Sequence, residues 1–330
     1  MPDLIPSIDI SALFAAGSAA RAATDQAIRR AAAETGFMLV HTFPDDVPVG
    51  AAARAQLLRL FDLPADQIRP LWRQKFDPSH RNVYRGWFAL QSGHPTAKEG
   101  IDMGPDVAYG ESVVERSDPL REATPLPEEA ALPGWRAAVA HYYRGMGRVS
   151  QALMRSIARS LGLPERYFDA SFDKGLSTLR LIRYPVREDG EFSVTHGGLP
   201  RMLTGAPHVD SGFLTLLAQD GVEGLQARHS SGAWIDVPPR ESSLAVNFGK
   251  VLEQWSGGKI RATEHRVIGS GRERRSIAFF HEARADAEIS PLPLAGAASF
   301  EPFFYGDYLW TTTTKFVEFR GMETLRKPRR

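Results

Sequence analysis

The second half of the chain consists of short apolar stretches that clusters of turn residues interrupt at regular intervals. From Leu176 onward, segments rich in β-branched and aromatic residues alternate with groups of Gly, Asp, Pro and Ser. Repeated short strands with turn chemistry between them are typical of an antiparallel double sheet. The sequence therefore predicts a jelly-roll core, the double-stranded β-helix, over residues 176–285. Its strands are predicted near residues 177–184, 213–218, 223–228, 243–247, 266–268 and 276–281.

The segments on either side of this core are predicted to be helical or irregular. Apolar residues recur at helical spacing from Trp135 to Leu161, so we expect a helix over residues 135–162 that braces the core from outside. Residues 1–134 are predicted to form an α/β module with entrance loops, packed on the outside of the core. Residues 286–330 are predicted to form a cap and a solvated basic tail. We expect residues 1–330 to form a single unit, mostly β with flanking helices (α+β).

The composition argues against several classes of function. A net charge of +1 gives no electrostatic case for binding nucleic acid or an anionic membrane. The chain has no cysteine, which excludes disulfides and thiolate metal sites and fits a cytoplasmic location. No signal peptide and no apolar run long enough for a transmembrane helix is expected. We therefore expect a small-molecule substrate, with no nucleic acid, membrane or protein partner.

One stretch carries residues with the chemistry of a metal site. In PHVDSGFLTLLAQ, His208 and Asp210 stand two positions apart at the start of an apolar run. Such residues point to the same side of an extended strand, so both side chains can reach one ion. Of the nine histidines, most are expected at the surface or in the core, and His265 in RATEHRVIG is the best candidate for a third ligand. Two imidazoles and one carboxylate form the facial triad of non-haem Fe(II) oxygenases, which leaves coordination positions open for oxygen and a co-substrate.

An arginine and a serine follow His265 closely. In GRERRSIAFFHEA, Arg274, Ser276 and Phe280 share one face of the predicted strand. A guanidinium group binds a carboxylate through two parallel N–H bonds, and a buried arginine without an anionic partner is destabilising. We therefore expect Arg274 to hold an acidic ligand, unless one of the chain's own acidic residues pairs with it.

Together these motifs resemble the isopenicillin N synthase-like branch of the Fe(II)/2-oxoglutarate-dependent dioxygenases. The segments IPSIDIS, SLGLPERYF, LRLIRYP and VNFG extend the resemblance over nearly the whole chain. The resemblance implies that His208, Asp210 and His265 bind Fe(II). It further implies that Arg274 and Ser276 hold the distal carboxylate of 2-oxoglutarate.

The resemblance also implies a reaction. Such an enzyme uses O2 to decarboxylate 2-oxoglutarate to succinate while it oxidises, most often by hydroxylation, a small soluble organic molecule, with ascorbate as the reductant in vitro. Tyr184 matches the family tyrosine that hydrogen-bonds 2-oxoglutarate near the metal. The family's frequent asparagine two residues earlier is Ile182 here, so one polar contact to the co-substrate is expected to be missing.

Alternatives stay open at this point. Isopenicillin N synthase and the ethylene-forming plant oxidase share the triad and the Arg-x-Ser pair without using 2-oxoglutarate, although Tyr184 favours a 2-oxoglutarate-dependent enzyme. Breakdown of 2-oxoglutarate itself, as in bacterial ethylene formation, is a further iron-dependent reaction. A jelly-roll metal-binding protein or isomerase would leave Arg274 and Ser276 without a role.

The sequence does not identify the substrate. Substrate choice is expected to depend on the loops at residues 76–134 and 286–310, and neither hydroxylation versus desaturation or cyclisation nor the oligomeric state follows from the residues. Five aromatic residues are predicted to line the substrate cavity, although core packing explains them equally well: Tyr84, Trp87, Phe248, Phe280 and Phe304.

Overall fold

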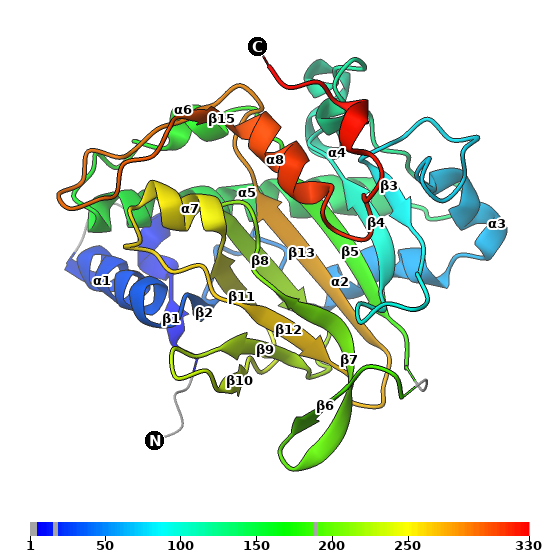
Figure 1. The fold of residues 1–330 in the computed structure, drawn as a ribbon, viewed down its shortest axis with the longest axis horizontal. Coiled ribbons are helices and arrows are strands. Elements are labelled where there is room, and N and C mark those ends of the chain that lie inside the picture. The colour runs from blue at the N-terminus through cyan, green and yellow to red at the C-terminus, as the bar shows by residue number, and fades with distance from the viewer. Residues whose placement is uncertain (1–4, 16–18, 188–189, 330) are drawn as a thin grey trace.

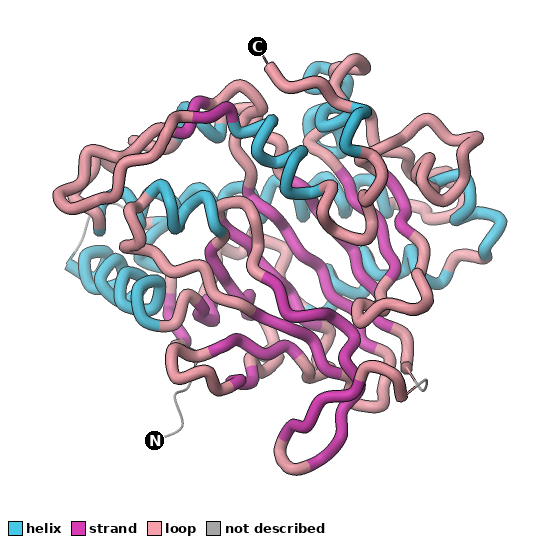
Figure 2. Tube along the Cα trace, viewed as in Figure 1, coloured by secondary structure: helices cyan, strands magenta, loops and turns pink. Residues whose placement is uncertain are grey.

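The computed structural model describes residues 5–15, 19–187 and 190–329 of the chain. Two curled β-sheets form its core, and helices flank them (Figures 1 and 2). The strands of the large sheet are β1 (Ser7–Asp9), β2 (Phe37–His41), β3 (Gly86–Phe88), β4 (Glu99–Met103), β5 (Thr178–Tyr184), β8 (Leu214–Gln219), β11 (Ser243–Phe248) and β13 (Arg274–His281). Those of the small sheet are β6 (Ser193–His196), β7 (Leu199–His208), β9 (Leu225–Arg228), β10 (Trp234–Asp236) and β12 (His265–Ile268).

The helices lie mainly outside these sheets. They are α1 (Ala19–Glu34), α2 (Ala51–Leu58), α3 (Ala65–Ile68), α4 (Asp106–Tyr109), α5 (Trp135–Ser160), α6 (Asp169–Phe172), α7 (Lys250–Trp255) and α8 (Tyr305–Thr313). A short ribbon of β14 (Glu288–Ile289) and β15 (Phe303–Phe304) precedes α8. Among the described residues, no helix combines the length and the apolar character needed to span a bilayer.

The strand order is that of a double-stranded β-helix with additional edge strands. Within the described residues the large sheet runs β1-β2-β11-β8-β13-β5-β4-β3 and the small sheet runs β10-β9-β12-β7-β6. Strands of the core pair antiparallel with their neighbours. The predicted jelly-roll core with flanking helices is therefore confirmed.

The N-terminal segment differs from the expectation that it packs outside the core. Its strands extend both edges of the large sheet: β2 pairs with β11, and β4 pairs with β5. An unpaired sheet edge exposes backbone N–H and C=O groups, and these added strands satisfy them. The sequence shows a buried strand at residues 37–40 but carries no local signal for the strand with which it pairs.

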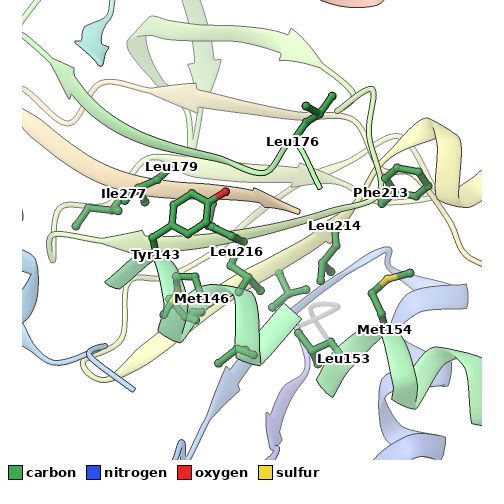
Figure 3. Packing of buried hydrophobic residues seen from close by; sticks show 14 of the residues in the cluster. Tyr143, Met146, Leu153, Met154, Leu176, Leu179, Phe213, Leu214, Leu216 and Ile277 are labelled. Atoms are coloured by element: carbon green, nitrogen blue, oxygen red, sulfur yellow. The ribbon is translucent and has the colours of Figure 1, made fainter. Parts of the chain in front are cut away.

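The helix α5 covers the outer face of the large sheet, as predicted. Figure 3 shows Tyr143, Met146 and Leu153 of this helix packed toward Leu216 of β8 and Ile277 of β13. All five side chains are at most 3% exposed. Burying one large apolar side chain contributes about 1.5–3 kcal/mol, so this face fixes the sheet against the helix.

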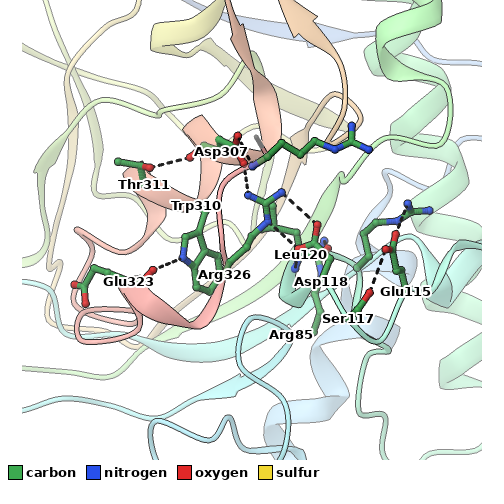
Figure 4. A network of polar contacts seen from close by, with 12 residues as sticks. Arg85, Glu115, Ser117, Asp118, Leu120, Asp307, Trp310, Thr311, Glu323 and Arg326 are labelled. Carbon is green, nitrogen blue, oxygen red and sulfur yellow. Dashed lines mark hydrogen bonds and ion pairs between the residues drawn. The ribbon is translucent and has the colours of Figure 1, made fainter.

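The C-terminal segment is held in place rather than solvated. Arg326 lies between two carboxylates, with its Nε 2.9 Å from Asp118 and its Nη1 2.6 Å from Asp307 (Figure 4). Trp310 on α8 also donates a hydrogen bond to the Glu323 carbonyl at 3.0 Å. The expectation of a solvated tail is wrong because Asp118, which anchors it, is distant in sequence.

The last residue of β13 is a buried histidine on the outer face of the sheet. His281 stacks on Phe172 with ring centroids 4.3 Å apart, and its Nδ1 has no hydrogen-bond partner among the described residues. Burial lowers its pKa from 6.5 to about 3. The unfolded chain therefore takes up a proton below pH ~6.5 that the folded chain refuses, and stability falls as pH falls from about 6.5 toward 3.

This histidine provides a test of stability against pH. We expect wild type to lose about 2 kcal/mol more stability than His281→Phe between pH 7 and pH 5. Urea unfolding of both proteins at the two pH values measures the difference, with His141→Phe on the exposed side of α5 as control. Equal losses in wild type and His281→Phe would contradict the prediction.

Candidate active site

Three strand ends bring the predicted triad together. His208 ends β7 and His265 begins β12, and these two residues are direct partners in the antiparallel ladder. The Nε2 atoms of both imidazoles lie 3.7 Å from Oδ1 of Asp210. The three candidate ligand atoms all lie within 4.8 Å of one another. This spacing places two imidazole nitrogens and one carboxylate oxygen around a common point, the donor set of an octahedral non-haem iron site.

Hydrogen bonds from outside the triad orient each candidate ligand. Nδ1 of His208 lies 2.8 Å from the Ala206 carbonyl, and Nδ1 of His265 lies 3.1 Å from the Thr263 carbonyl. A carbonyl accepts only from a protonated Nδ1, which leaves Nε2 with its lone pair free to coordinate. Each imidazole is thereby held in the tautomer that a metal requires.

Two polar side chains hold the other oxygen of the carboxylate. Oδ2 of Asp210 accepts hydrogen bonds from the Thr215 hydroxyl at 2.6 Å and from the Asn247 amide at 2.7 Å. Thr215 and Asn247 are register partners on β8 and β11. The sequence prediction missed both residues, although a polar residue inside each apolar run was a usable signal. With Oδ2 bonded twice, Oδ1 is the oxygen that faces the imidazoles.

The backbone at Asp210 differs from the expected extended strand. β7 ends at His208, so Asp210 lies in the loop that follows, and its carbonyl accepts a hydrogen bond from the Lys250 amide at 2.8 Å. The side chains still converge because this anchor and the bonds from Thr215 and Asn247 fix the loop. The alternation rule gave the right pairing here for a different geometric reason.

The triad is electrostatically suited to a cation. Burial and the neighbouring His265 lower the pKa of His208 to about 4, so this imidazole is neutral at pH 7. Burial alone would raise the pKa of Asp210, but the two imidazoles and the bonds from Thr215 and Asn247 hold it below its usual value. Two neutral imidazoles and one carboxylate are the charge state in which these groups bind metals.

A ladder of paired residues forms the wall next to the triad. The register of β13 with β5 sets Arg274 against Tyr184 and Ser276 against Ile182. All four residues are buried, and the Arg274 guanidinium lies over the Tyr184 ring at 5.2 Å. The predicted sharing of one strand face by Arg274 and Ser276 is therefore seen in the structure.

Arg274 and Ser276 lack the partners that buried polar groups normally have. Nη2 of Arg274 donates to the Gln219 side chain at 3.1 Å, whereas its Nε and Nη1 and the Ser276 hydroxyl have no partner among the described residues. No carboxylate of the described chain forms an ion pair with Arg274. Buried polar groups are nearly always hydrogen-bonded, so these atoms fit an anionic ligand that enters from outside.

The triad and this pair open into one cavity of about 420 Å³. Tyr84, Tyr184 and Phe280 line it, as the sequence predicted for them. Trp87, which packs on Phe61, and the fully buried Phe248 lie outside its lining, as does Phe304. The last three are therefore not carried into the proposed substrate site.

The cavity also contains charged residues that the sequence prediction did not identify. Lys98 and Glu318 form an ion pair at 2.8 Å across its mouth. Glu282 is buried and accepts a hydrogen bond from the Tyr305 hydroxyl, and burial raises its pKa well above the usual value. Lys98 and Glu318 are far apart in sequence, and no local pattern pairs them.

Comparison with known proteins agrees with this geometry. The family model of the 2OG-Fe(II) oxygenase superfamily matches residues 177–283. Isopenicillin N synthase of Streptomyces clavuligerus is 30% identical over 311 residues, which cover 92% of this chain and 93% of that protein. The chain belongs to the 2OG-Fe(II) oxygenase superfamily.

Other members of the superfamily align over a similar length. The 2-oxoglutarate-Fe(II) type oxidoreductase hxnY of Emericella nidulans is 29% identical over 91% of this chain and 86% of its own. The crystal structure of a full-length Neurospora crassa protein in complex with alpha-KG superposes with a TM-score of 0.79 at 24% identity, covering 94% of this chain and 96% of that one, which supports the fold. The predicted oxidoreductase class and the predicted Fe(II) and 2-oxoglutarate cofactors are confirmed at the level of this superfamily.

Proposed function

We propose that this protein is an Fe(II)- and 2-oxoglutarate-dependent dioxygenase that hydroxylates a small organic molecule. His208, Asp210 and His265 hold the iron, and Arg274 with Ser276 holds the distal carboxylate of 2-oxoglutarate. The observation that carries the proposal is the set of unpartnered buried polar atoms on Arg274 and Ser276, in the same cavity as the triad. When bound, the iron supplies the activation of O2 that couples decarboxylation of 2-oxoglutarate to oxidation of the substrate.

The residues of this chain position the reactants and keep water out. Arg274 offers two free N–H groups and Ser276 a hydroxyl, which together match the oxygens of one carboxylate. Beside them Ile182 presents an apolar surface where the family's frequent asparagine would offer an amide. Buried Leu225 and Val267 also line this end of the cavity, so the co-substrate site is dry and its ionic contacts are strong.

A second candidate is an Fe(II) oxidase that does without 2-oxoglutarate. The relative that is 30% identical over most of the chain is an isopenicillin N synthase, and isopenicillin N synthases do not need 2-oxoglutarate. In such an enzyme Arg274 and Ser276 would hold a carboxylate of the substrate itself. The stacking of Arg274 on Tyr184 is compatible with both candidates, so only an experiment separates them.

Succinate formation without any substrate tests the proposed function. Wild type is incubated with Fe(II), ascorbate and 2-oxoglutarate, and succinate is measured together with equilibrium binding of 2-oxoglutarate to the iron-loaded protein without O2. We expect tight binding and slow succinate release, because this class turns over slowly without its substrate. An iron-loaded protein that neither binds 2-oxoglutarate nor forms succinate would favour the oxidase.

The bonds to Oδ2 of Asp210 lead to a further prediction. Thr215→Val removes one hydroxyl at nearly constant volume, and we expect the affinity for Fe(II) to fall roughly 10- to 100-fold, as for other outer partners of metal ligands. Iron binding is measured by equilibrium dialysis. The matched control is Thr204→Val, since the hydroxyl of this buried threonine bonds the Val267 carbonyl at 3.3 Å and does not contact the triad. Equal affinities in Thr215→Val and Thr204→Val would show that Thr215 does not orient the ligand.

A further inference from the structure

The cavity has a second cationic end, formed by Arg180. This residue lies on β5, and its side chain lines the same cavity as that of Tyr184, four residues further along the strand. The register sets Arg180 against Ala278 of β13, two inward-facing pairs from the pairing of Tyr184 with Arg274. At a strand rise of ~3.3 Å per residue, Arg180 and Tyr184 are separated by roughly 13 Å along the strand. A five-carbon diacid held by Arg274 is too short to reach Arg180.

Arg180 shares its only carboxylate with another buried arginine. Its Nε and Nη2 lie 2.5 and 2.8 Å from the oxygens of Asp102, and Arg73 bonds the same Asp102. Neither arginine forms an ion pair with any other carboxylate of the described chain. This cluster of three therefore carries one net positive charge, although Arg73 and Asp102 are almost completely buried. An unbalanced buried charge is destabilising, so the cluster favours an anion in the cavity beside it.

The remaining charges of the cavity do not cancel this surplus. Even with both acids ionised, the lining outside the triad and Arg274 holds two more cations than anions, and burial raises the pKa of one of these acids. Two of the cations, Lys315 and Arg320, are exposed and add positive potential that attracts anions to the cavity. The charged side chains concerned are Lys98, Arg180, Lys315 and Arg320 against Glu282 and Glu318.

The surroundings of Arg180 are those of a binding group. Its guanidinium lies over the rings of Phe88 and Phe280 at 5.1 and 5.3 Å, which fixes its plane. Its Nη1 forms no hydrogen bond within the described residues, since Nε and Nη2 are the nitrogens that bond Asp102. The facing residue, Ala278, is small and leaves this nitrogen accessible from the cavity. Apolar side chains, among them Phe280, Leu309 and Phe316, cover much of the remaining wall.

We propose that the substrate oxidised by this enzyme is a monocarboxylic acid with an apolar body, and that Arg180 binds its carboxylate. This inference rests on the proposed function, and it deepens it by naming the class of substrate. One surplus charge in the arginine cluster matches one carboxylate, and the aromatic and aliphatic wall matches the apolar body. Arg274 and Arg180 thus hold the two acids, the co-substrate and the substrate, from opposite ends of one strand pair.

Binding of acids and of their neutral amides tests this proposal. The metal-loaded enzyme, saturated with 2-oxoglutarate and free of O2, is titrated calorimetrically with phenylacetate, 3-phenylpropionate and indole-3-acetate and with the three primary amides. We expect at least one acid to bind 10-fold or more tightly than its amide. Arg180→Gln is expected to weaken that acid roughly 10- to 100-fold and to leave its amide unchanged, because the lost contact is a charged hydrogen bond.

Two further variants separate binding from a purely structural role. Arg180→Lys keeps the charge and is expected to restore part of the affinity for the acid. Arg183→Gln removes a cation from the other face of β5, where Arg183 pairs with Glu99 and Glu273 at the surface, and is expected to leave the acid's affinity unchanged. Equal loss for acid and amide in Arg180→Gln would show that Arg180 only braces Asp102. That result, or failure of every acid to bind wild type more tightly than its amide, would overturn the proposal.

The binding assay also keeps this inference distinct from the proposed function. Succinate formation without substrate tests the reaction, whereas the comparison of acid with amide tests recognition and needs no turnover. An acid that binds through Arg180 in a protein that forms no succinate would refute the reaction alone. Succinate formation with no preference for acids would refute the inference alone.

Discussion

Asp210→Ala is expected to lose iron binding and, with it, all formation of succinate from 2-oxoglutarate. Asp210 supplies the only carboxylate oxygen among the three candidate ligand atoms, and its negative charge is the only one in the triad. Loss of an outer hydrogen-bond partner weakens metal sites roughly 10- to 100-fold, and loss of a ligand itself must exceed that. Iron content after dialysis and succinate formation at saturating 2-oxoglutarate measure the two effects.

The control for this variant is a carboxylate that pairs elsewhere. Asp169 on α6 forms an ion pair with Arg155 at 2.6 Å, away from the cavity, so Asp169→Ala removes a comparable charge without touching the triad. We expect it to bind iron as wild type does. Thermal unfolding of Asp210→Ala shows whether the variant is folded, since Thr215 and Asn247 lose their acceptor. Wild-type iron affinity in a folded Asp210→Ala would refute the assignment of the triad.

Arg274→Met is expected to raise the KM for 2-oxoglutarate while the affinity for iron stays unchanged. Truncating one partner of a buried ion pair costs about 2–5 kcal/mol, which corresponds to a loss of affinity of roughly 30- to 4,000-fold. Methionine keeps most of the side-chain volume, so the effect reports the guanidinium rather than a cavity. Initial rates of succinate formation over a range of 2-oxoglutarate concentrations give the KM.

The neighbouring arginine on the same strand provides a matched control. Arg275 points to the opposite face of β13, where it pairs with Glu273 at 2.8 Å and Asp62 at 3.2 Å. We expect Arg275→Met to leave the KM unchanged. If the two variants had the same KM for 2-oxoglutarate, the co-substrate would have to bind elsewhere in the cavity.

The parts of the site that depend on strand alternation could be predicted from the sequence. Arg274 and Ser276 face inward together because side chains alternate along a strand, and this pattern is local. His265 was matched to His208 across 57 positions only because imidazole is rare enough in the chain to leave few candidates.

The parts that depend on distant segments could not be predicted. Arg180 reads in sequence as one more basic residue of LRLIRYP, and its meaning depends on Asp102, which another strand of the sheet supplies. Glu318 and Lys98 meet only because the C-terminal segment returns over the cavity. Such pairings follow from tertiary structure, whereas the sequence states only local preferences.

The pairing of β5 with β13 has a consequence for how such enzymes diversify. Because successive inward-facing positions on these strands serve different molecules, a substitution at Arg180 or Ala278 alters the substrate end alone. The residues at Tyr184 and Arg274 meanwhile keep their own neighbours. An insertion in either strand, by contrast, would turn every following side chain to the other face and abolish both ends at once. Descendants of this chain can therefore acquire new substrates by point mutation while the oxidising machinery is inherited intact.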